Sequence, residues 1–184
     1  MPMSLRQRLK ANDLLIGTMV TLNSREVAEI VADVGFDWLC FDGEHGAIDV
    51  AHSLQGLLQA ARGESACIVR VPALDEAAVK HVLDSGATGV MVPQVHTAEQ
   101  AAQAVRWAHY PPEGTRGMGI ARAHGYGFRV AEYLESADAN TVVIVQAESA
   151  QAVGEIDAIA QVPGVDAVLI GPYDLSASLG HPGD

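Results

Sequence analysis

Short apolar runs alternate with longer segments of helical periodicity along this chain. The runs are continuously apolar rather than alternately apolar and polar, which is typical of parallel strands covered on both faces. Six strands are predicted, at residues 15–20, 38–41, 67–71, 89–92, 141–145 and 167–170. Repeated strand and helix units with short links indicate a parallel sheet with right-handed crossovers.

The segments between the strands predict helices. One covers residues 24–34, with Ser24 as its cap and Gly35 as its stop. Its apolar side chains fall on one face, which we expect to be buried: Val27, Ile30, Val31 and Val34. Further helices are predicted at residues 49–61, 75–85, 97–109 and 149–161.

Two α/β architectures fit this order: an open doubly wound sheet and a closed eight-stranded barrel. The 184 residues favour the open sheet, since a barrel typically needs about 250. No Gly-x-Gly-x-x-Gly follows the first strand, so a dinucleotide site has no support. Residues 110–132, rich in Gly, Pro and Arg, are predicted to form a long functional connection between the fourth and fifth strands.

Composition narrows the class of protein. A hydrophobic content of 49% supports one folded domain over residues 1–184. The formal net charge of −12 opposes nucleic-acid binding, and no apolar run is long enough to span a bilayer. We therefore expect a cytoplasmic protein. Cys40 and Cys67 lie within predicted strands, where a small buried side chain is expected rather than a disulfide.

Polar side chains cluster in the sequence where the predicted strands end. This is the edge of a parallel α/β sheet at which ligands bind, so we expect them to converge. They are Asp42, Glu44 and His45 after the second strand, Arg70 in the third, Gln146 and Glu148 after the fifth, and Asp174 after the sixth.

Glu148 and Asp174 form a candidate metal-binding pair. They follow neighbouring predicted strands, which lie about 4.8 Å apart, so both carboxylates are expected to reach one cation. Hard oxygen ligands favour Mg²⁺ or Mn²⁺. The alternative is that both acids only cap the helices that follow them.

His45 and Arg70 are candidates for catalysis. A carboxylate three residues away, Asp42, is expected to orient the imidazole of His45 and raise its basicity. The alternative for a lone loop histidine is an ordinary surface position. Arg70 lies in an apolar strand, which suggests either a clamp on a substrate oxygen or a structural ion pair with Asp42 or Glu44.

The segment Gly171-Pro172-Tyr173-Asp174 opens the last predicted helix, with the proline suited to its first turn. The free backbone N–H groups of Tyr173 and Asp174 are expected to point at a substrate carboxylate.

Five motifs, in order, resemble the HpcH/HpaI aldolase family: WLCFDGEH at 38–45, VRVP at 69–72, YPPEGTRG at 110–117, VQAES at 145–149 and GPYDLSASLG at 171–180. The resemblance implies a TIM (β/α)8 barrel of the phosphoenolpyruvate/pyruvate type. It also implies a class II aldolase that needs a divalent cation, Mg²⁺, Mn²⁺ or Co²⁺. The implied reaction is the reversible cleavage of a 4-hydroxy-2-oxo acid to pyruvate and an aldehyde.

The resemblance also implies roles for single residues. Glu148 and Asp174 would bind the metal, His45 assisted by Asp42 would act as the base, and Arg70 would lie at the keto oxygen. Gln146 would support the substrate. Asp84 would approach the site of a neighbouring subunit, since the family forms homo-oligomers, commonly hexamers.

Relatives in this family continue past the position of Asp184, so we expect about six of eight βα units here. An aldolase that forms a Schiff base would need a lysine at the barrel mouth, and the only lysines are Lys10 and Lys80. Two alternatives stay open: an acyl-CoA lyase of the citrate lyase β group and a catalytically impaired shortened relative. The sequence does not specify the aldehyde.

Overall fold

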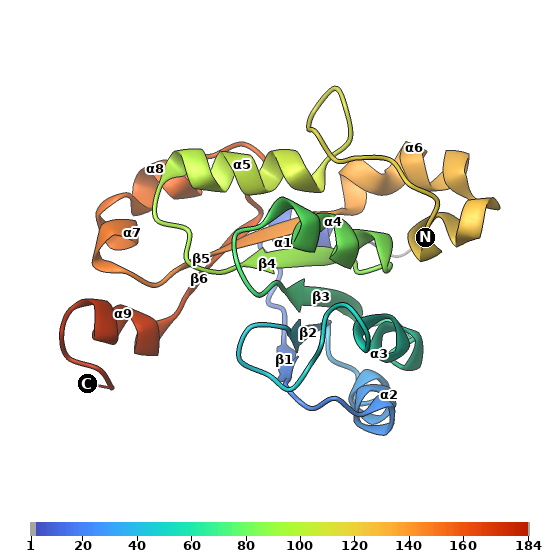
Figure 1. Cartoon of the computed structure of the whole chain (residues 1–184), viewed down its shortest axis with the longest axis horizontal. Coiled ribbons are helices and arrows are strands. Elements are labelled where there is room, and N and C mark those ends of the chain that lie inside the picture. Colours follow the sequence, from blue (N-terminus) through green and yellow to red (C-terminus); the bar gives the residue numbers. More distant parts are fainter. Residues whose placement is uncertain (1–2, 184) are drawn as a thin grey trace.

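The computed structural model describes residues 3–183, which form a curled parallel sheet with helices outside it (Figure 1). The sheet contains six strands, and all neighbouring strands are parallel. They are β1 (Gly17–Val20), β2 (Trp38–Asp42), β3 (Ala66–Arg70), β4 (Gly89–Val92), β5 (Val142–Ala147) and β6 (Ala167–Ile170). Each predicted strand is confirmed to within two residues at either end.

The order of the strands decides between the two architectures. Each strand lies beside its neighbour in the chain, in the order β1-β2-β3-β4-β5-β6. In a doubly wound sheet the order in which strands are added reverses once, as in 3-2-1-4-5-6. In a barrel each strand is added beside the one before it in the chain. The sheet is therefore a half-barrel of the TIM type. This confirms the barrel with about six βα units that the family resemblance implies, and it excludes the open sheet that chain length alone would favour.

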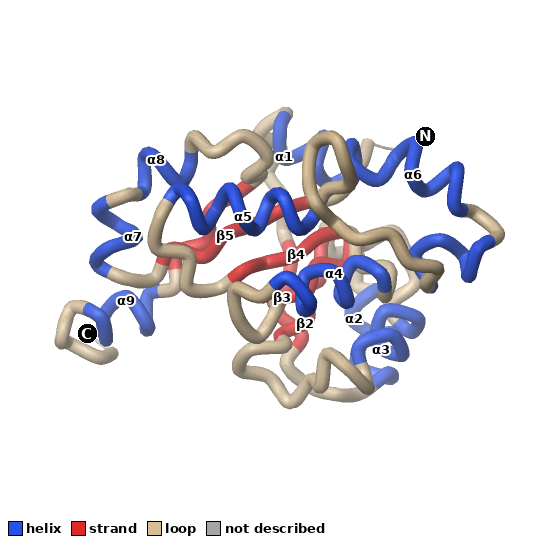
Figure 2. Tube along the Cα trace, turned by 45° about the horizontal axis from the view of Figure 1, so that its top comes forward, coloured by secondary structure: helices blue, strands red, loops and turns tan. Residues whose placement is uncertain are grey.

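The helices are α1 (Leu5–Lys10), α2 (Arg25–Asp33), α3 (Leu54–Ala60), α4 (Glu76–Asp84), α5 (Ala98–Ala108), the 3-10 helix η1 (Arg122–Gly127), α6 (Val130–Asn140), α7 (Ala150–Gly154), α8 (Ile156–Ala160) and α9 (Pro172–Ser178). Most of them cover the outer side of the strands (Figure 2), whereas α1 packs on the other face through Leu5 and Leu9. The sequence pattern missed α1 and α6. It also predicted one helix where α7 and α8 form two, broken at Glu155. Within residues 3–183 no helix is long and apolar enough to cross a membrane.

The predicted cap of α2 is confirmed, but its predicted buried face is partly wrong. The Ser24 hydroxyl accepts a hydrogen bond from the N–H of Val27 at 3.2 Å. The buried residues of α2 are Ala28 and Ala32, whereas Ile30 and Val34 are each 63% exposed. Alanine has no side chain beyond Cβ, so this face approaches the core closely, and the larger apolar side chains lie on the flanks.

The strands carry a hydrophobic cluster on each face. Phe41 and Val69 belong to the larger cluster, with residues of the surrounding helices. Cys40, Ile68 and Met91 belong to the smaller cluster, which Leu5 of α1 joins. The predicted burial of both cysteines is confirmed: they are free thiols, and burial raises the pKa of Cys40 to about 12 and that of Cys67 to about 11.

The long segment between the fourth and fifth strands is not a βα connection. The link from β4 to α5 covers only residues 93–97, and residues 109–129 follow α5 instead. A segment between a helix and the next strand lies at the end of the barrel where strands begin. Active sites of this architecture form at the carboxyl ends of the strands. Residues 109–129 therefore lie at the opposite end of the barrel from the expected active site.

Candidate active site

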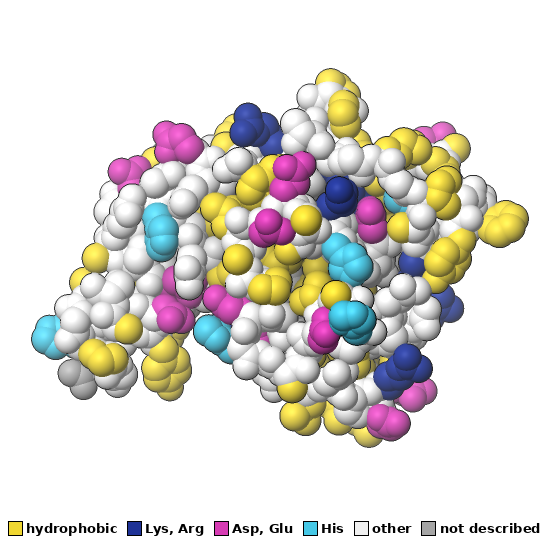
Figure 3. Space-filling model, viewed as in Figure 1, with side chains coloured by type: hydrophobic (Ala, Val, Ile, Leu, Met, Phe, Trp, Pro, Cys, Tyr) yellow, Lys and Arg dark blue, Asp and Glu magenta, His cyan; other side chains and the backbone are white. Residues whose placement is uncertain are grey.

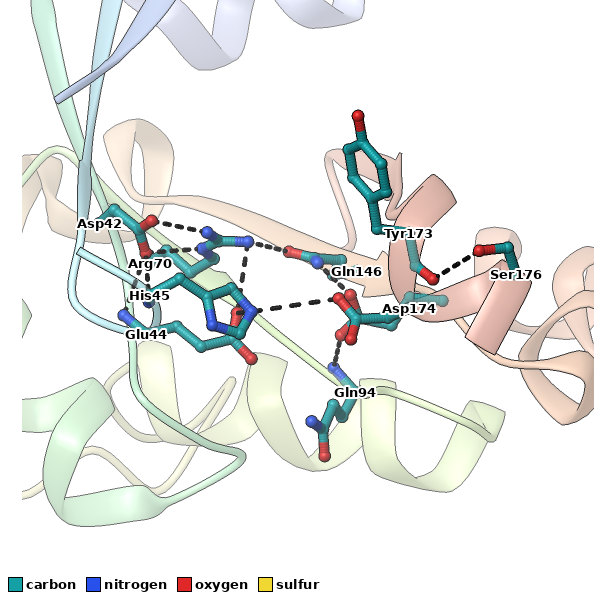
Figure 4. Close-up of polar contacts among 10 residues, drawn as sticks. Asp42, Glu44, His45, Arg70, Gln94, Gln146, Tyr173, Asp174 and Ser176 are labelled. Atoms are coloured by element: carbon teal, nitrogen blue, oxygen red, sulfur yellow. Dashed lines mark hydrogen bonds and ion pairs between the residues drawn. The ribbon is translucent and has the colours of Figure 1, made fainter. Parts of the chain in front are cut away.

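The polar residues predicted at the strand ends converge on one edge of the half-barrel (Figure 4). Asp42 and Arg70 are the last residues of β2 and β3 and are partners in the register of the two strands. Gln146 lies near the end of β5, and Glu148 follows this strand. Asp174 lies in the first turn of α9, after β6. The prediction that these positions meet is confirmed by the contacts described below.

Asp42 accepts four hydrogen bonds. Its Oδ1 accepts from Arg70 Nε at 2.9 Å and from the backbone N–H groups of Glu44 and His45, and its Oδ2 accepts from Arg70 Nη2 at 2.7 Å. Burial by itself raises the pKa of a carboxyl group, but the hydrogen bonds from Arg70 and the backbone hold the pKa of Asp42 below its usual value. Asp42 is thus a buried anion that orders both the guanidinium and the turn after β2.

Arg70 forms the ion pair with Asp42 that was one of the two alternatives left open by the sequence. Its side chain is 11% exposed, and two of its nitrogens bind Asp42. Its third nitrogen, Nη1, lies 3.3 Å from Gln146 Oε1 and 3.3 Å from Glu44 Oε2. The ion pair with Asp42 therefore fixes the plane of the guanidinium, with Nη1 directed toward the other polar residues of the site.

Glu148 is buried and held by two donors. Its Oε1 accepts the backbone N–H of Gln94 at 2.7 Å, and its Oε2 accepts from the side-chain amide of Gln146. Gly171 leaves the space for this carboxylate, since a Cβ at that position would lie 2.5 Å from Glu148 Oε2. The carboxylate orientation is therefore set by β5, the loop after β4 and the start of α9.

His45 lies at the mouth with its side chain 59% exposed. Its Nε2 is 3.7 Å from Glu44 Oε2 and 4.0 Å from Asp174 Oδ2. Asp42 binds the backbone N–H of His45, so the expectation that Asp42 orients the imidazole ring is wrong. The acids nearest to the ring are Glu44 and Asp174, because the turn after β2 directs Asp42 toward Arg70.

Sequence reasoning gave two residues of this cluster no catalytic or metal-binding role. Glu44 was expected at this edge of the sheet, with no assigned role except as a possible partner for Arg70. Its Oε2 is buried without a hydrogen-bond partner among the described residues. Burial raises its pKa, and the negative charges of Glu148 and Asp174 raise it further. Gln94 acts through its backbone in the left-handed conformation (φ 53°), for which the sequence carries no signal.

A cavity of about 550 Å³ opens among these residues. Figure 3 shows acidic side chains and a histidine side by side between the projecting α9 and the rest of the chain. The cavity combines polar and apolar walls: Met19, Trp38, His45, Arg70, Met91, Gln146, Leu169, Ile170, Gly171, Pro172, Tyr173 and Asp174. The Tyr173 ring is 77% exposed and points away from the carboxylates (Figure 4). The volume suits a small organic acid.

The donors present fit a hard divalent cation. Within residues 3–183 no group of three His, Cys, Asp or Glu side chains is arranged to hold a metal ion. Yet Glu44 Oε2 is a buried oxygen without a hydrogen-bond partner, and it lies near two further carboxylates, Glu148 and Asp174. Close acidic oxygens in a partly buried site are the donor set that Mg²⁺ and Mn²⁺ prefer.

Asp84 lies apart from this cluster. It ends α4, and its Oδ1 accepts a hydrogen bond from the fully buried Arg116 at 2.7 Å. The end of α4 precedes β4, so Asp84 belongs to the opposite end of the half-barrel. Its expected approach to a neighbouring subunit stays a prediction.

Comparisons with known proteins agree with this arrangement. The family model described as HpcH/HpaI aldolase/citrate lyase matches residues 15–184. The chain is 44% identical to a hydroxypyruvate/pyruvate aldolase of Paraburkholderia phytofirmans, covering 98% of this chain and 72% of that protein. It is also 44% identical to a 4-hydroxy-2-oxovalerate aldolase of Rhodococcus jostii, covering 98% and 70%.

A solved structure shares the fold. It is an HpcH/HpaI aldolase/citrate lyase family protein from Burkholderia cenocepacia, 43% identical, with a TM-score of 0.92. The match covers 98% of this chain and 73% of that one. The resemblance drawn from the five motifs is thereby confirmed.

Proposed function

The chain belongs to the HpcH/HpaI aldolase/citrate lyase family, and from this membership we propose that it cleaves a 4-hydroxy-2-oxo acid reversibly to pyruvate and an aldehyde. Relatives at 44% identity over nearly the whole chain are named aldolases, so the chain is a carbon–carbon lyase. One observation carries the choice of substrate: the guanidinium of Arg70, fixed by Asp42, lines the same cavity as Asp174. The buried Glu148 is joined to this guanidinium through the side chain of Gln146. This arrangement suits an α-oxo acid, which carries two adjacent oxygen groups.

Members of the family depend on a divalent cation. We assign Glu148 and Asp174 as its protein ligands in this chain, with Mg²⁺, Mn²⁺ or Co²⁺ as the ion. When bound, the cation supplies Lewis-acid polarisation of the substrate keto oxygen. Glu44 adds negative charge close to both ligands, which favours a divalent ion over a monovalent one.

Arg70 stabilises charge at the keto oxygen. Its Nη1 is the nitrogen that Asp42 does not bind, so it is the donor directed at the substrate. Negative charge develops on that oxygen as the C3–C4 bond breaks, and a preorganised donor lowers the barrier. The side chain of Gln146 binds both Arg70 and Glu148 and so fixes their positions relative to each other. It also contacts the substrate.

His45 acts as the base. It takes the proton of the 4-hydroxyl group, directly or through a water. The electrons of the O–H bond form the aldehyde C=O, and those of the C3–C4 bond form the C2–C3 double bond of the pyruvate enolate. Protonation at C3 then gives pyruvate. The exposed position of His45 suits a group that exchanges its proton with solvent.

The backbone N–H groups of Tyr173 and Asp174, in the first turn of α9, point at the substrate carboxylate. The apolar residues of the cavity, among them Met19, Leu169 and Ile170, contact the remainder of the substrate. We further propose a single domain over residues 1–184, a cytoplasmic location and a homo-oligomer, with Asp84 near the neighbouring subunit.

Release of pyruvate tests this function. Pyruvate should appear from a panel of 4-hydroxy-2-oxo acids only when Mg²⁺, Mn²⁺ or Co²⁺ is present, and EDTA should stop its release. Formation of acetyl-CoA from an acyl-CoA substrate, without pyruvate, would favour the acyl-CoA lyase alternative. Absence of both products would favour a catalytically impaired relative.

A further inference from the structure

A second polar cavity lies at the opposite end of the half-barrel from the candidate active site. It has a volume of about 430 Å³ and is lined by Arg62, Gly86, Ala87, Arg122, Ala123, Arg129 and Tyr133. Arg62 lies before β3, and Gly86 lies before β4. Arg122 begins η1 and Arg129 follows it, so both lie in the segment before β5. All these segments lie where strands begin.

The three arginines of this cavity lack acidic partners. The arginine ion pairs within residues 3–183 involve other arginines, and none of them includes Arg62, Arg122 or Arg129. The chain carries a formal net charge of −12, so acids to pair with them are plentiful. Three arginines gathered without a carboxylate are electrostatically unfavourable unless an anion joins them.

Arg122 is the fixed member of the group. It donates to the backbone carbonyls of Ser85 at 2.6 Å and Leu58 at 3.5 Å, while its Nε is buried without a hydrogen-bond partner among the described residues. Gly86 leaves room for it, since a Cβ there would lie 2.6 Å from Arg122 Nη1. Burial lowers the pKa of Arg122, and the charge of Arg62 lowers it further.

Tyr133 supplies another donor. Its hydroxyl oxygen accepts a hydrogen bond from Arg116 Nη1 at 3.1 Å, which leaves the hydroxyl hydrogen available for an acceptor. Arg62 and Arg129 are exposed, so their guanidinium groups are able to move onto a ligand. One rigid arginine, two mobile ones and a hydroxyl donor match the oxygen-rich surface of a small dianion.

We propose that the cavity formed by Arg62, Arg122, Arg129 and Tyr133 is a binding site for a small dianion whose acceptors are phosphate or carboxylate oxygens. The site is separate from the aldolase site, because the two lie at opposite ends of the strands. A ligand here binds the segments before β3 and β4 and the η1 segment at the same time. Its binding stabilises the folded state by mass action.

Calorimetric titration and thermal unfolding test the site. Inorganic phosphate and malonate are titrated separately into the full chain, with sodium chloride at matched ionic strength as the blank. At least one of them should bind and raise the unfolding temperature beyond the effect of the chloride. Binding of phosphate alone would assign a phosphate-bearing ligand, and binding of malonate alone a dicarboxylate.

The double variant Arg62→Gln/Arg129→Gln should weaken that binding by roughly tenfold or more, because charge-assisted hydrogen bonds are lost. Both side chains are exposed and their charges repel that of Arg122, so without anion the double variant should be at least as stable as the wild type. Arg106→Gln, which removes one positive charge from an exposed position of α5, is the control and should bind like the wild type. Equal binding by the double variant, binding by neither anion, or a chloride blank that reproduces the effect would overturn the proposal.

Discussion

Asp42 and Arg70 end neighbouring strands in register and are joined by two hydrogen bonds, from Nε to Oδ1 at 2.9 Å and from Nη2 to Oδ2 at 2.7 Å. Both side chains are nearly buried, with 3% and 11% exposed. In such a setting neither charge is easily replaced, since removal of one leaves the other buried and unpaired. The pair sets the direction of Arg70 Nη1, on which the proposed substrate contact depends.

Arg70→Lys tests this geometry. Lysine keeps the charge but lacks the planar fork, so it cannot bind both Asp42 oxygens and also reach Gln146. We expect turnover to fall by about 10²–10³-fold, the usual cost of a lost donor at a developing oxyanion. Steady-state kinetics of pyruvate release measures it, with circular dichroism as a check on folding. Wild-type kinetics would leave Arg70 with only its structural ion pair.

Glu148→Gln and Asp174→Asn test the proposed metal ligands. Each substitution replaces a carboxylate by a neutral amide of similar shape, so the fold should persist while Mn²⁺ affinity and activity are lost. Binding of Mn²⁺ is followed by electron paramagnetic resonance. Glu135→Gln, at an exposed position of α6, is the matched control. The assignment fails if either ligand variant binds Mn²⁺ as the wild type does.

His45→Ala separates the base from the groups that hold pyruvate. We expect aldol cleavage to fall by about 10²–10⁴-fold, the usual contribution of a positioned general base. Pyruvate binding should change little, because Arg70, Glu148 and Asp174 remain. Cleavage and pyruvate affinity are measured on the same preparation. Cleavage near the original rate would remove His45 from the mechanism, and His52→Ala, on an exposed turn, is the control.

Gly171→Ala tests the space that Glu148 occupies. The new Cβ would lie 2.5 Å from Glu148 Oε2 and 2.9 Å from Gln146 Nε2, so the carboxylate must move. Gly171 has φ −93°, which alanine also adopts, so backbone strain does not contribute. We expect a loss of activity of roughly 10–100-fold, since small displacements of catalytic groups are costly. Gly119→Ala, with nothing within 4 Å of the added Cβ, should be neutral by the same kinetic assay.

His124 predicts a pH dependence of stability. Its ring is fully buried, accepts from the N–H of Ala121 and lies 3.0 Å from Tyr110 Oη. Burial lowers its pKa in the folded state. Above about pH 6.5 the ring is neutral in both states; below that pH only the unfolded chain gains the proton, so stability falls until the folded-state pKa is passed.

His124→Gln should therefore lessen the loss of unfolding free energy between about pH 6.5 and 5, the range below the ordinary histidine pKa. Urea unfolding at a series of pH values measures this slope. His181→Gln, at an exposed position, is the comparison and should keep the wild-type slope. If both variants lose stability equally with falling pH, His124 is not the group that titrates.

Local sequence patterns predicted the strands, the Ser24 cap of α2, the start of α9 and the strand ends at which the polar residues gather. These features depend on local properties: the continuous apolar runs, the Ser24 side chain beside the N–H of Val27, and Pro172 at the first position of α9. The rule that carboxyl ends of parallel strands share one edge then brought Arg70 and Glu148 together without any knowledge of contacts.

The contacts between these groups are set by the packing of segments distant in the chain. Asp42 binds Arg70, 28 positions away, rather than the ring of His45, and Gln94 reaches Glu148 across 54 positions through its backbone. Neither contact has a spacing that a sequence encodes. The order of the strands, the buried face of α2 and the end of the barrel at which residues 109–129 lie likewise follow from packing between segments distant in the chain.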